Sequence, residues 1–434
     1  MEIYTNPPRE LWEDILKRPV INNAKLEKVV NEIIEKIKEE GDNALYFYNK
    51  KFDNPLQESF IVPYDELANS ESAVSPELKK AIDVAYQNIY TFHASQKENV
   101  SVVEVMPGIR CWRESRAIER VGFYIPGGSA PLFSTILMLA VPAKIAGCKE
   151  IVLCTPDNKE GTLHPAILYT AHKCGITKVF KIGGAAAIAA MAYGTQTVPK
   201  VNKIFGPGNQ YVTMAKTLVF KDGIAIDMPA GPSEVMIVAD DNANPMFVAA
   251  DILSQAEHGT DSQAIVLSQS EELLQQINIQ TQKLVHTLSR SDIANEALQH
   301  SKLIRFDDKQ ELIDFMNQYA PEHLILSINN HAEFCKYVIN AGSVFLGNFA
   351  PESAGDYASG TNHTLPTNGA AKSFSGVSLD SFIKKITFQA ITPAGLKILG
   401  PDIETLAAAE GLDAHKLAVN VRLDFLDNSI KNNL

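Results

Sequence analysis

Short apolar segments alternate with helix-forming segments along the chain from Val121 to Leu346. A strand followed by a helix and another strand favours parallel pairing, because the helix carries the chain back along one face of the sheet. The alternation therefore predicts twisted parallel sheets covered by helices. The strand-like segments are 122–125, 150–154, 178–182, 203–205, 234–239, 264–267, 303–306, 323–327 and 343–346.

A chain of 434 residues is long for a single hydrophobic core, so the strands are expected to form two sheets. We predict an α/β protein with two Rossmann-like parallel-sheet domains, one inserted in the other, plus a small helical C-terminal tail. No linker rich in Ser, Gly or Pro separates the two series of strands, which favours an insertion. The expected parts are an N-terminal extension (1–24), a first α/β domain (25–117 and 236–378), an inserted α/β domain (118–235) and the tail (379–434).

The end of the chain is predicted to form two helices. The pattern over 403–410 is helical, Gly411 ends it, and Asp413 can cap a last helix that carries Leu417 and Val421. Such a tail has little surface to bury by itself. We therefore expect it to dock on another subunit.

Net charge and cysteine spacing indicate which partners and which cellular compartment to expect. The formal net charge is −12, whereas proteins that bind nucleic acid or anionic membranes generally need a positive surface. The five cysteines form no CxxC pair and no zinc-ribbon spacing, as expected in a reducing compartment. The first eight residues show no signal-peptide pattern, and the most apolar run, 132–141, is too short to span a bilayer. We expect a cytoplasmic protein with no nucleic-acid or membrane partner.

Candidate metal ligands lie near the end of one predicted helix. Asn244 and Pro245 predict its start, and Gly259 predicts its end. Gln255 and His258 are three residues apart, so they share one helix face. An imidazole beside an amide oxygen can supply half of a metal site, although a polar helix end without a ligand is the more common explanation.

Two other segments carry polar groups beside predicted strands. Glu322 and His323 precede a strand, where they can act as general acid–base groups or form an ordinary polar pair at the strand edge. The irregular segment 347–363 contains two carboxylates and a histidine, and long loops at strand ends often form sites. Asp356 is therefore a candidate to complete a metal site with Gln255 and His258, and His415 of the tail is a candidate for a further nitrogen ligand.

Two glycine-rich turns, 126–129 and 206–209, each follow a strand and precede a helix. Backbone amides at such helix N-termini can bind phosphate groups. Neither turn matches the GxGxxG fingerprint, so the signal for a nucleotide is weak. Backbone geometry at a tight turn also explains the glycines.

The chain resembles histidinol dehydrogenases from about Trp112 to its end, because several unusual motifs occur in the family's order and spacing. Its first hundred residues resemble the family only loosely. The motifs are VGFYIPGGSAP (121–131), KIFGPGN (203–209), DMPAGPSE (227–234), LSQAEHG (253–259), PEHL (321–324) and the loop 342–366.

The resemblance implies a zinc enzyme that oxidises L-histidinol to L-histidine through a bound aldehyde and reduces two NAD+. It also implies a homodimer in which the tail of each subunit reaches the other subunit's site. The first α/β domain would carry the catalytic and zinc residues, and the inserted domain would bind NAD. The implied zinc ligands are Gln255, His258, Asp356 and His415.

The same resemblance assigns the remaining roles. His323 would be the general base, and Glu322 would activate water for the second oxidation. The chain departs from the family at Ala186, where a glutamine that contacts NAD is frequent. The implied NAD contacts are Tyr124, Ala186 and Asn209, and the implied substrate contacts are Ser233, Gln255, His258, His323, Asp356, His363, Glu410 and His415.

Three other functions remain open at this stage. A related zinc- and NAD-dependent dehydrogenase acting on another amino alcohol would need the same residues. A zinc hydrolase would use Glu322 to activate metal-bound water without NAD. A non-catalytic α/β scaffold would use the motif residues for structure alone.

Overall fold

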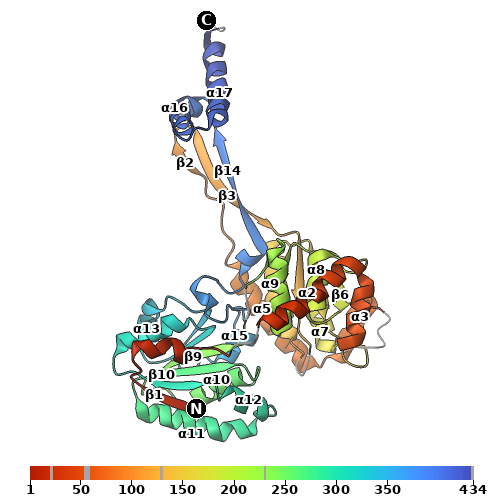
Figure 1. Cartoon of the computed structure of the whole chain (residues 1–434), viewed down its shortest axis with the longest axis vertical. Helices are drawn as coiled ribbons and strands as arrows, with labels where there is room; N and C mark the ends of the chain where they lie inside the picture. Colours follow the sequence, from red (N-terminus) through yellow and green to blue (C-terminus); the bar gives the residue numbers. More distant parts are fainter. Residues whose placement is uncertain (20–22, 53–58, 128–130, 229–230, 432–434) are drawn as a thin grey trace. The chain divides into compact units, whose positions relative to one another are not determined.

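The computed structural model of the chain describes residues 1–19, 23–52, 59–127, 131–228 and 231–431. Its elements form two compact units (Figure 1). The first unit comprises 1–96 and 118–382, and the second comprises 97–117 and 383–434.

The first unit contains a five-stranded parallel sheet in the order β6-β5-β4-β7-β8. Alternate strand residues enter two separate cores, so the sheet is covered on both faces. The strands are β4 (Arg120–Tyr124), β5 (Glu150–Thr155), β6 (Lys178–Lys181), β7 (Lys203–Phe205) and β8 (Ala225–Ile226). One face packs against α2 (Asn23–Glu40), α3 (Asp42–Phe52), α8 (Gly184–Tyr193) and α9 (Gln210–Lys221). The other packs against α4 (Tyr64–Asn69), α5 (Pro76–Ala94), α6 (Phe133–Ala146) and α7 (Pro165–Lys173).

The same unit contains a six-stranded parallel sheet in the order β1-β11-β10-β9-β12-β13 (Figure 1). Its strands are β1 (Glu2–Thr5), β9 (Glu234–Ala239), β10 (Gln263–Ser268), β11 (Lys302–Arg305), β12 (His323–Ser327) and β13 (Ser343–Leu346). One face packs against α10 (Pro245–Ala256), α11 (Glu271–Leu284) and α12 (Ser291–Ala297). The other packs against α1 (Trp12–Ile15), α13 (Lys309–Tyr319) and α14 (His331–Phe334).

Short elements complete the first unit. The helix α15 (Glu352–Tyr357) follows β13 after a five-residue loop and lies beside α10. The 3-10 helices are η1 (Arg9–Leu11), η2 (Ser70–Ala73), η3 (Val285–Thr287), η4 (Cys335–Tyr337), η5 (Ala370–Lys372) and η6 (Leu379–Phe382).

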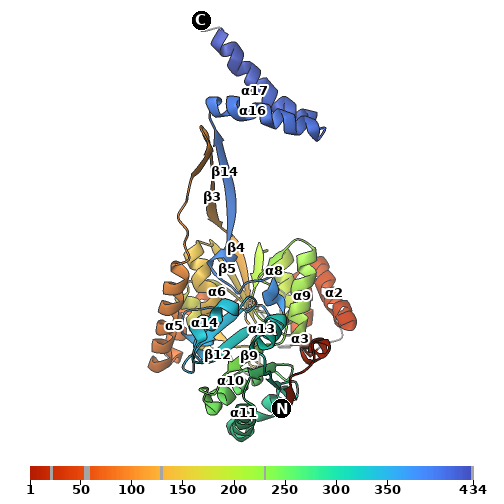
Figure 2. The same cartoon turned by 90° about the vertical axis from the view of Figure 1, so that its left-hand side faces the viewer.

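The second unit joins an antiparallel sheet to two helices (Figure 2). The sheet has the order β14-β3-β2, and its strands are β2 (Val103–Met106), β3 (Ile109–Ala117) and β14 (Ile383–Ile391). The helices are α16 (Pro393–Ala409) and α17 (Asp413–Lys431), which pack against each other. Their contact is close at Gly400, where a Cβ atom would lie 2.8 Å from Leu423 Cδ1.

These observations confirm the predicted α/β class, its two parallel sheets and its helical C-terminal tail. The grouping of segments differs from the predicted domains. Residues 1–24 contribute β1 to the six-stranded sheet, whereas α2 to α5 pack on the five-stranded sheet because their apolar faces join its cores. The tail begins with a strand, because β14 pairs with β3 along nine residues. None of the helices among the described residues combines the length and the hydropathy that a membrane-spanning segment needs.

The helix α10 begins where the sequence predicts and ends earlier. The side chain of Asn244 accepts a hydrogen bond from the Met246 N–H, and Pro245 is the first helical residue. The helix ends at Ala256, so His258 lies in the following turn rather than inside the helix. Its N–H still donates to the Gln255 carbonyl at 3.3 Å, which keeps the two residues together.

Replacing the cap residue of α10 is expected to destabilise the protein slightly. The Asn244→Ala variant loses one hydrogen bond to an otherwise unpaired helical N–H, which costs about 1 kcal/mol. Urea unfolding should show a lower midpoint. Asn295→Ala, in the exposed middle of α12, is the control and should shift the unfolding free energy by less than about 0.5 kcal/mol. Equal midpoints for both variants would show that the cap contributes nothing.

Candidate active site

The candidate site lies at the amino edge of the six-stranded sheet. Glu234 and His323 are the first residues of β9 and β12, and these strands are neighbours. The helix α10 runs back from the opposite edge, so its last turn delivers Gln255 to the same place. The helix α15 adds Glu352 and Asp356, which are one turn apart on one face.

His323 lies among three carboxylates, and its side chain is only 5% exposed. Its Nδ1 lies 3.6 Å from Glu322 Oε2 and 3.8 Å from Glu352 Oε1, and its Nε2 lies 3.5 Å from Asp356 Oδ1. Its Nδ1 also lies 3.3 Å from the Glu234 carbonyl oxygen. A carbonyl oxygen only accepts, so this contact favours a proton on Nδ1 and directs Nε2 toward Asp356.

The charges of this cluster act strongly on one another. Burial lowers the pKa of His323, but the carboxylates of Glu352, Glu322 and Asp356 outweigh it and raise that pKa to about 10. Burial raises the pKa of Glu322 to about 8, despite the opposing effect of His323. Burial also raises the pKa of Glu352 well above its usual range. The site therefore holds more acidic groups than its own cations neutralise, which favours a bound cation.

Three residues offer ligand atoms to such a cation. One atom each from His258, Glu352 and Asp356 lies within 4.8 Å of the others. Nitrogen and carboxylate oxygen ligands suit zinc. Desolvation lowers the pKa of His258, which favours the neutral ring that binds a metal.

Gln255 lies beside this set and is fully buried. With its amide oriented so that both ends find partners, its nitrogen donates to the Glu352 carboxylate and its oxygen accepts from the Glu234 N–H at 3.2 Å. The amide thus links β9 to α15. Its predicted role as a metal ligand stays a prediction.

The other predicted substrate contacts are distributed over both units. Ser233 immediately precedes β9 and is half-buried. The His363 ring is linked at both nitrogens: Nε2 lies 3.0 Å from Thr135 Oγ1, and Nδ1 lies 2.8 Å from the Asp356 carbonyl oxygen. Glu410 and His415 belong to the second unit, and their roles in the site stay predictions.

The predicted NAD contacts gather at the carboxyl edge of the five-stranded sheet. Tyr124 ends β4, and its hydroxyl accepts a hydrogen bond from the Gly184 N–H at 3.0 Å. Asn209 caps α9 by accepting from the Tyr211 and Val212 N–H groups. Ala186 lies in the first turn of α8 and is half-buried.

The strand order of the five-stranded sheet favours ligand binding at its carboxyl edge. From β4 the chain continues to β5 and β6 on one side of the sheet and then to β7 and β8 on the other. Ligands of open α/β sheets bind where the direction changes, outside the carboxyl ends of the strands. Gly206 follows β7 with φ +122°, and a Cβ atom there would lie 2.0 Å from the Tyr124 carbonyl oxygen. Residues 128–130 of the first glycine turn and 229–230 of the 227–234 motif lie outside the described residues.

A model of the histidinol dehydrogenase family matches residues 16–423. The chain belongs to the histidinol dehydrogenase family. It is 57% identical to a histidinol dehydrogenase of Bacteroides thetaiotaomicron over 98% of this chain and 100% of that protein. It is 49% identical to the chloroplastic histidinol dehydrogenase of Arabidopsis thaliana over 95% of this chain and 88% of that protein. The crystal structure of histidinol dehydrogenase from Elizabethkingia anophelis aligns with a TM-score of 0.96 at 55% identity, covering 98% of this chain and 99% of that one.

Two residues of this candidate site had no role in the sequence-based prediction. Glu352 lies four residues before Asp356, a spacing that places both carboxylates on one face once 352–357 is known to be helical. The segment was predicted to be irregular, so that signal was missed. Glu234 contacts Glu322 and His323 through its backbone N–H and carbonyl groups. A pattern of residue types does not predict such backbone contacts.

Proposed function

We propose that this chain oxidises L-histidinol to L-histidine through a bound aldehyde, with reduction of two NAD+. Membership of the family over nearly the whole chain supports this function. The observation that carries the proposal is the convergence of Glu322, His323, His258 and Asp356 at one edge of the sheet.

In the first oxidation, neutral His323, the form that its pKa of about 10 makes available at alkaline pH, removes the hydroxyl proton while a hydride leaves the same carbon for NAD+. The Glu234 carbonyl holds Nδ1, so Nε2 is the atom that accepts the proton. This Nε2 is buried and faces Asp356 Oδ1 at 3.5 Å. The products are the aldehyde, one NADH and one proton.

In the second oxidation, water adds to the aldehyde and a second hydride leaves for the second NAD+. Glu322 takes a proton from this water, and His323 takes the proton of the resulting hydroxyl. The Glu234 N–H donates to Glu322 Oε2 at 3.0 Å and fixes the carboxylate beside His323. Burial raises the pKa of Glu322 to about 8, so the carboxylate form that takes this proton predominates only above about pH 8.

We assign zinc to the site formed by His258 and Asp356, together with Gln255 and with His415 of another subunit. The donor set and the surplus of buried carboxylates fit a divalent cation. When bound, zinc would supply a Lewis acid that binds and orients the imidazole and amino nitrogens of the substrate.

The proposal includes a homodimer in which Glu410 and His415 complete the site of the other subunit. NAD would bind near Tyr124, Ala186 and Asn209, at the point where the strand order changes direction. The protein would act in the cytoplasm.

The experiment that tests this function measures NADH formation by zinc-loaded protein with L-histidinol. Two NADH per histidinol, lost after chelation and restored by zinc, would support substrate, cofactor and metal together. No NADH from folded, zinc-replete protein would contradict the proposal. NADH formed with a different amino alcohol but not with histidinol would favour the related dehydrogenase.

Removing the proposed ligand of the tail is expected to lower zinc content. His415→Ala loses one of four ligands, so bound zinc per subunit should fall at limiting zinc, as measured by atomic absorption after dialysis. The control is His286→Ala, an exposed histidine in η3, which should keep the wild-type zinc content. Unchanged zinc in His415→Ala would remove this residue from the ligand set.

A further inference from the structure

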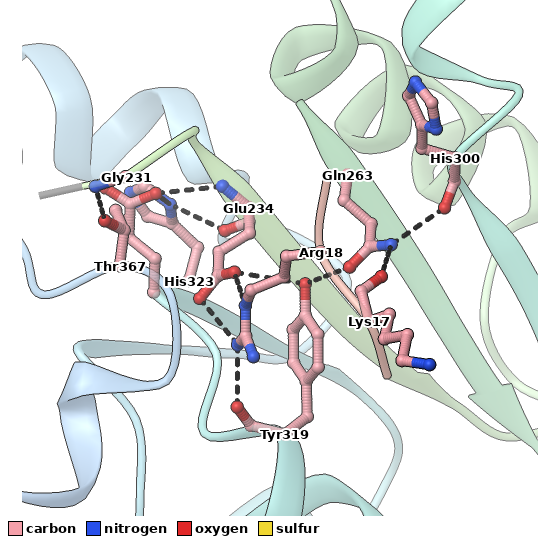
Figure 3. Close-up of polar contacts among 10 residues, drawn as sticks. Lys17, Arg18, Gly231, Glu234, Gln263, His300, Tyr319, His323 and Thr367 are labelled. Carbon is pink, nitrogen blue, oxygen red and sulfur yellow. Dashed lines mark hydrogen bonds and ion pairs between the residues drawn. The ribbon is translucent and has the colours of Figure 1, made fainter. Parts of the chain in front are cut away.

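The carboxylate of Glu234 is enclosed by hydrogen-bond donors, and its side chain is only 2% exposed. Arg18 donates to it with Nε and, at 2.9 Å, with Nη2 (Figure 3). The Tyr319 hydroxyl lies 3.3 Å from the same carboxylate. A two-point contact from arginine fixes both the position and the orientation of a carboxylate.

The backbone of Glu234 contacts both proposed catalytic residues. Its N–H donates to Glu322 Oε2 at 3.0 Å, and its carbonyl oxygen lies 3.3 Å from His323 Nδ1. Glu234 thus binds Arg18 through its side chain and contacts Glu322 and His323 through its backbone. Figure 3 shows Arg18 and His323 at opposite sides of Glu234.

Arg18 is itself held in place by several contacts. Its guanidinium lies 3.9 Å from the centre of the Tyr319 ring and donates to the Tyr319 carbonyl at 2.7 Å. The preceding residue, Lys17, offers its carbonyl to Gln263 Nε2 at 3.2 Å, and Gln263 Oε1 accepts from the Tyr319 hydroxyl at 2.8 Å. Upstream, α1 buries Trp12 in the core of the six-stranded sheet. The guanidinium therefore has a fixed position rather than a mobile surface one.

We propose that Arg18 is a positioning residue for the proposed oxidation and acts through Glu234. It holds the residue that orients Glu322 by an N–H group and His323 by a carbonyl group. Without Arg18 the buried carboxylate loses its two-point anchor, and the first residue of β9 shifts with it. Both proton-transfer groups then lose the orientation that Glu234 gives them. The expected loss of kcat rests on the proposed function. The expected displacement of Glu322 and His323 does not.

The test compares Arg18→Met, Arg18→Lys and Arg9→Met. Methionine keeps much of the length and packing of arginine, and lysine restores one charge without the two-point contact. Arg9 is the matched control, because it also pairs with a carboxylate, that of Asp314, and lies 4.8 Å from the centre of an aromatic ring, that of Trp12. Asp314 does not contact Glu322 or His323 in the described residues, so Arg9 has no such route to the site.

The kinetic readout is kcat and KM for L-histidinol and for the aldehyde, with zinc content and thermal midpoint measured alongside. Arg18→Met should lower kcat for both substrates about 10- to 100-fold, with KM changed less than about threefold and zinc content unchanged. Arg18→Lys should lie between Arg18→Met and the wild type, and Arg9→Met should stay within about twofold of the wild type. If the loss of kcat in Arg18→Met is fully explained by a smaller fraction of folded protein, the proposal is overturned.

A crystal structure of Arg18→Met supplies a readout that needs no substrate. The expected result is loss of the hydrogen bond from the Glu234 N–H to Glu322 and a displaced His323 ring. Unchanged positions of both side chains would overturn the proposal, whatever the activity. Glu322 and His323 can be displaced in Arg18→Met while the wild-type protein forms no NADH from histidinol. That pair of results would support the positioning role of Arg18 and contradict the proposed function.

Discussion

The His323→Gln variant is expected to lose about 10³-fold in kcat for L-histidinol and for the aldehyde, because both oxidations of the proposed mechanism need the same general base. Glutamine retains a polar amide near the Glu234 carbonyl but has no group that accepts a proton at neutral pH. Steady-state NADH formation with each substrate measures the loss. KM should change less than kcat, since the proton transfer belongs to the transition state.

The control for this variant is His286→Gln, which changes an exposed histidine of η3 and should leave both rates within about twofold. Zinc content must also be measured, because His323 lies beside the proposed ligand Asp356. A zinc-replete, folded His323→Gln protein with near wild-type kcat would exclude this residue as the base.

The amino edge of a parallel sheet is an unusual place for a catalytic site, since ligands of open α/β sheets normally bind at the carboxyl edge. In this chain the five-stranded sheet presents Tyr124 at its carboxyl edge, whereas the six-stranded sheet presents His323 at its amino edge. The two sheets thus offer different kinds of site. The first suits a nucleotide near glycine turns, and the second collects acidic and imidazole groups.

Part of this site was predictable because it depends on local sequence. Asn244 and Pro245 predict where α10 begins, and three-residue spacing predicts that Gln255 and His258 lie together. The structure places His258 beside Glu352 and Asp356, and it places Gln255 beside Glu352. The repeated strand–helix pattern likewise predicted the two parallel sheets.

The rest depends on contacts between distant segments. Arg18 reaches Glu234 across 216 positions, and nothing near either residue indicates the pairing. The pairing of β14 with β3 joins residues 383–391 to 109–117, so a tail that looks helical begins with a strand. Tertiary packing also decides that α2 to α5 cover the five-stranded sheet, because an amphipathic face does not specify which sheet it covers.

The Glu322→Gln variant is expected to separate the two oxidations. The aldehyde-to-acid step should slow about 10²- to 10³-fold, because glutamine cannot take the proton from water. The alcohol-to-aldehyde step should slow less than about tenfold, because His323 alone serves that step in the proposed mechanism. Single-turnover NADH formation from histidinol and from the aldehyde measures the two steps separately.

The controls for Glu322→Gln separate a chemical role from a structural one. Glu333→Gln, an exposed carboxylate of α14 that pairs with Lys336, should leave both steps unchanged. Glutamine also keeps an oxygen that can accept the hydrogen bond from the Glu234 N–H, so the orientation of the side chain should survive. Equal slowing of both steps would therefore assign Glu322 to the support of His323 rather than to water activation. A selective loss in the second step would leave His323 as the shared base and Glu322 as the group that makes the second oxidation possible.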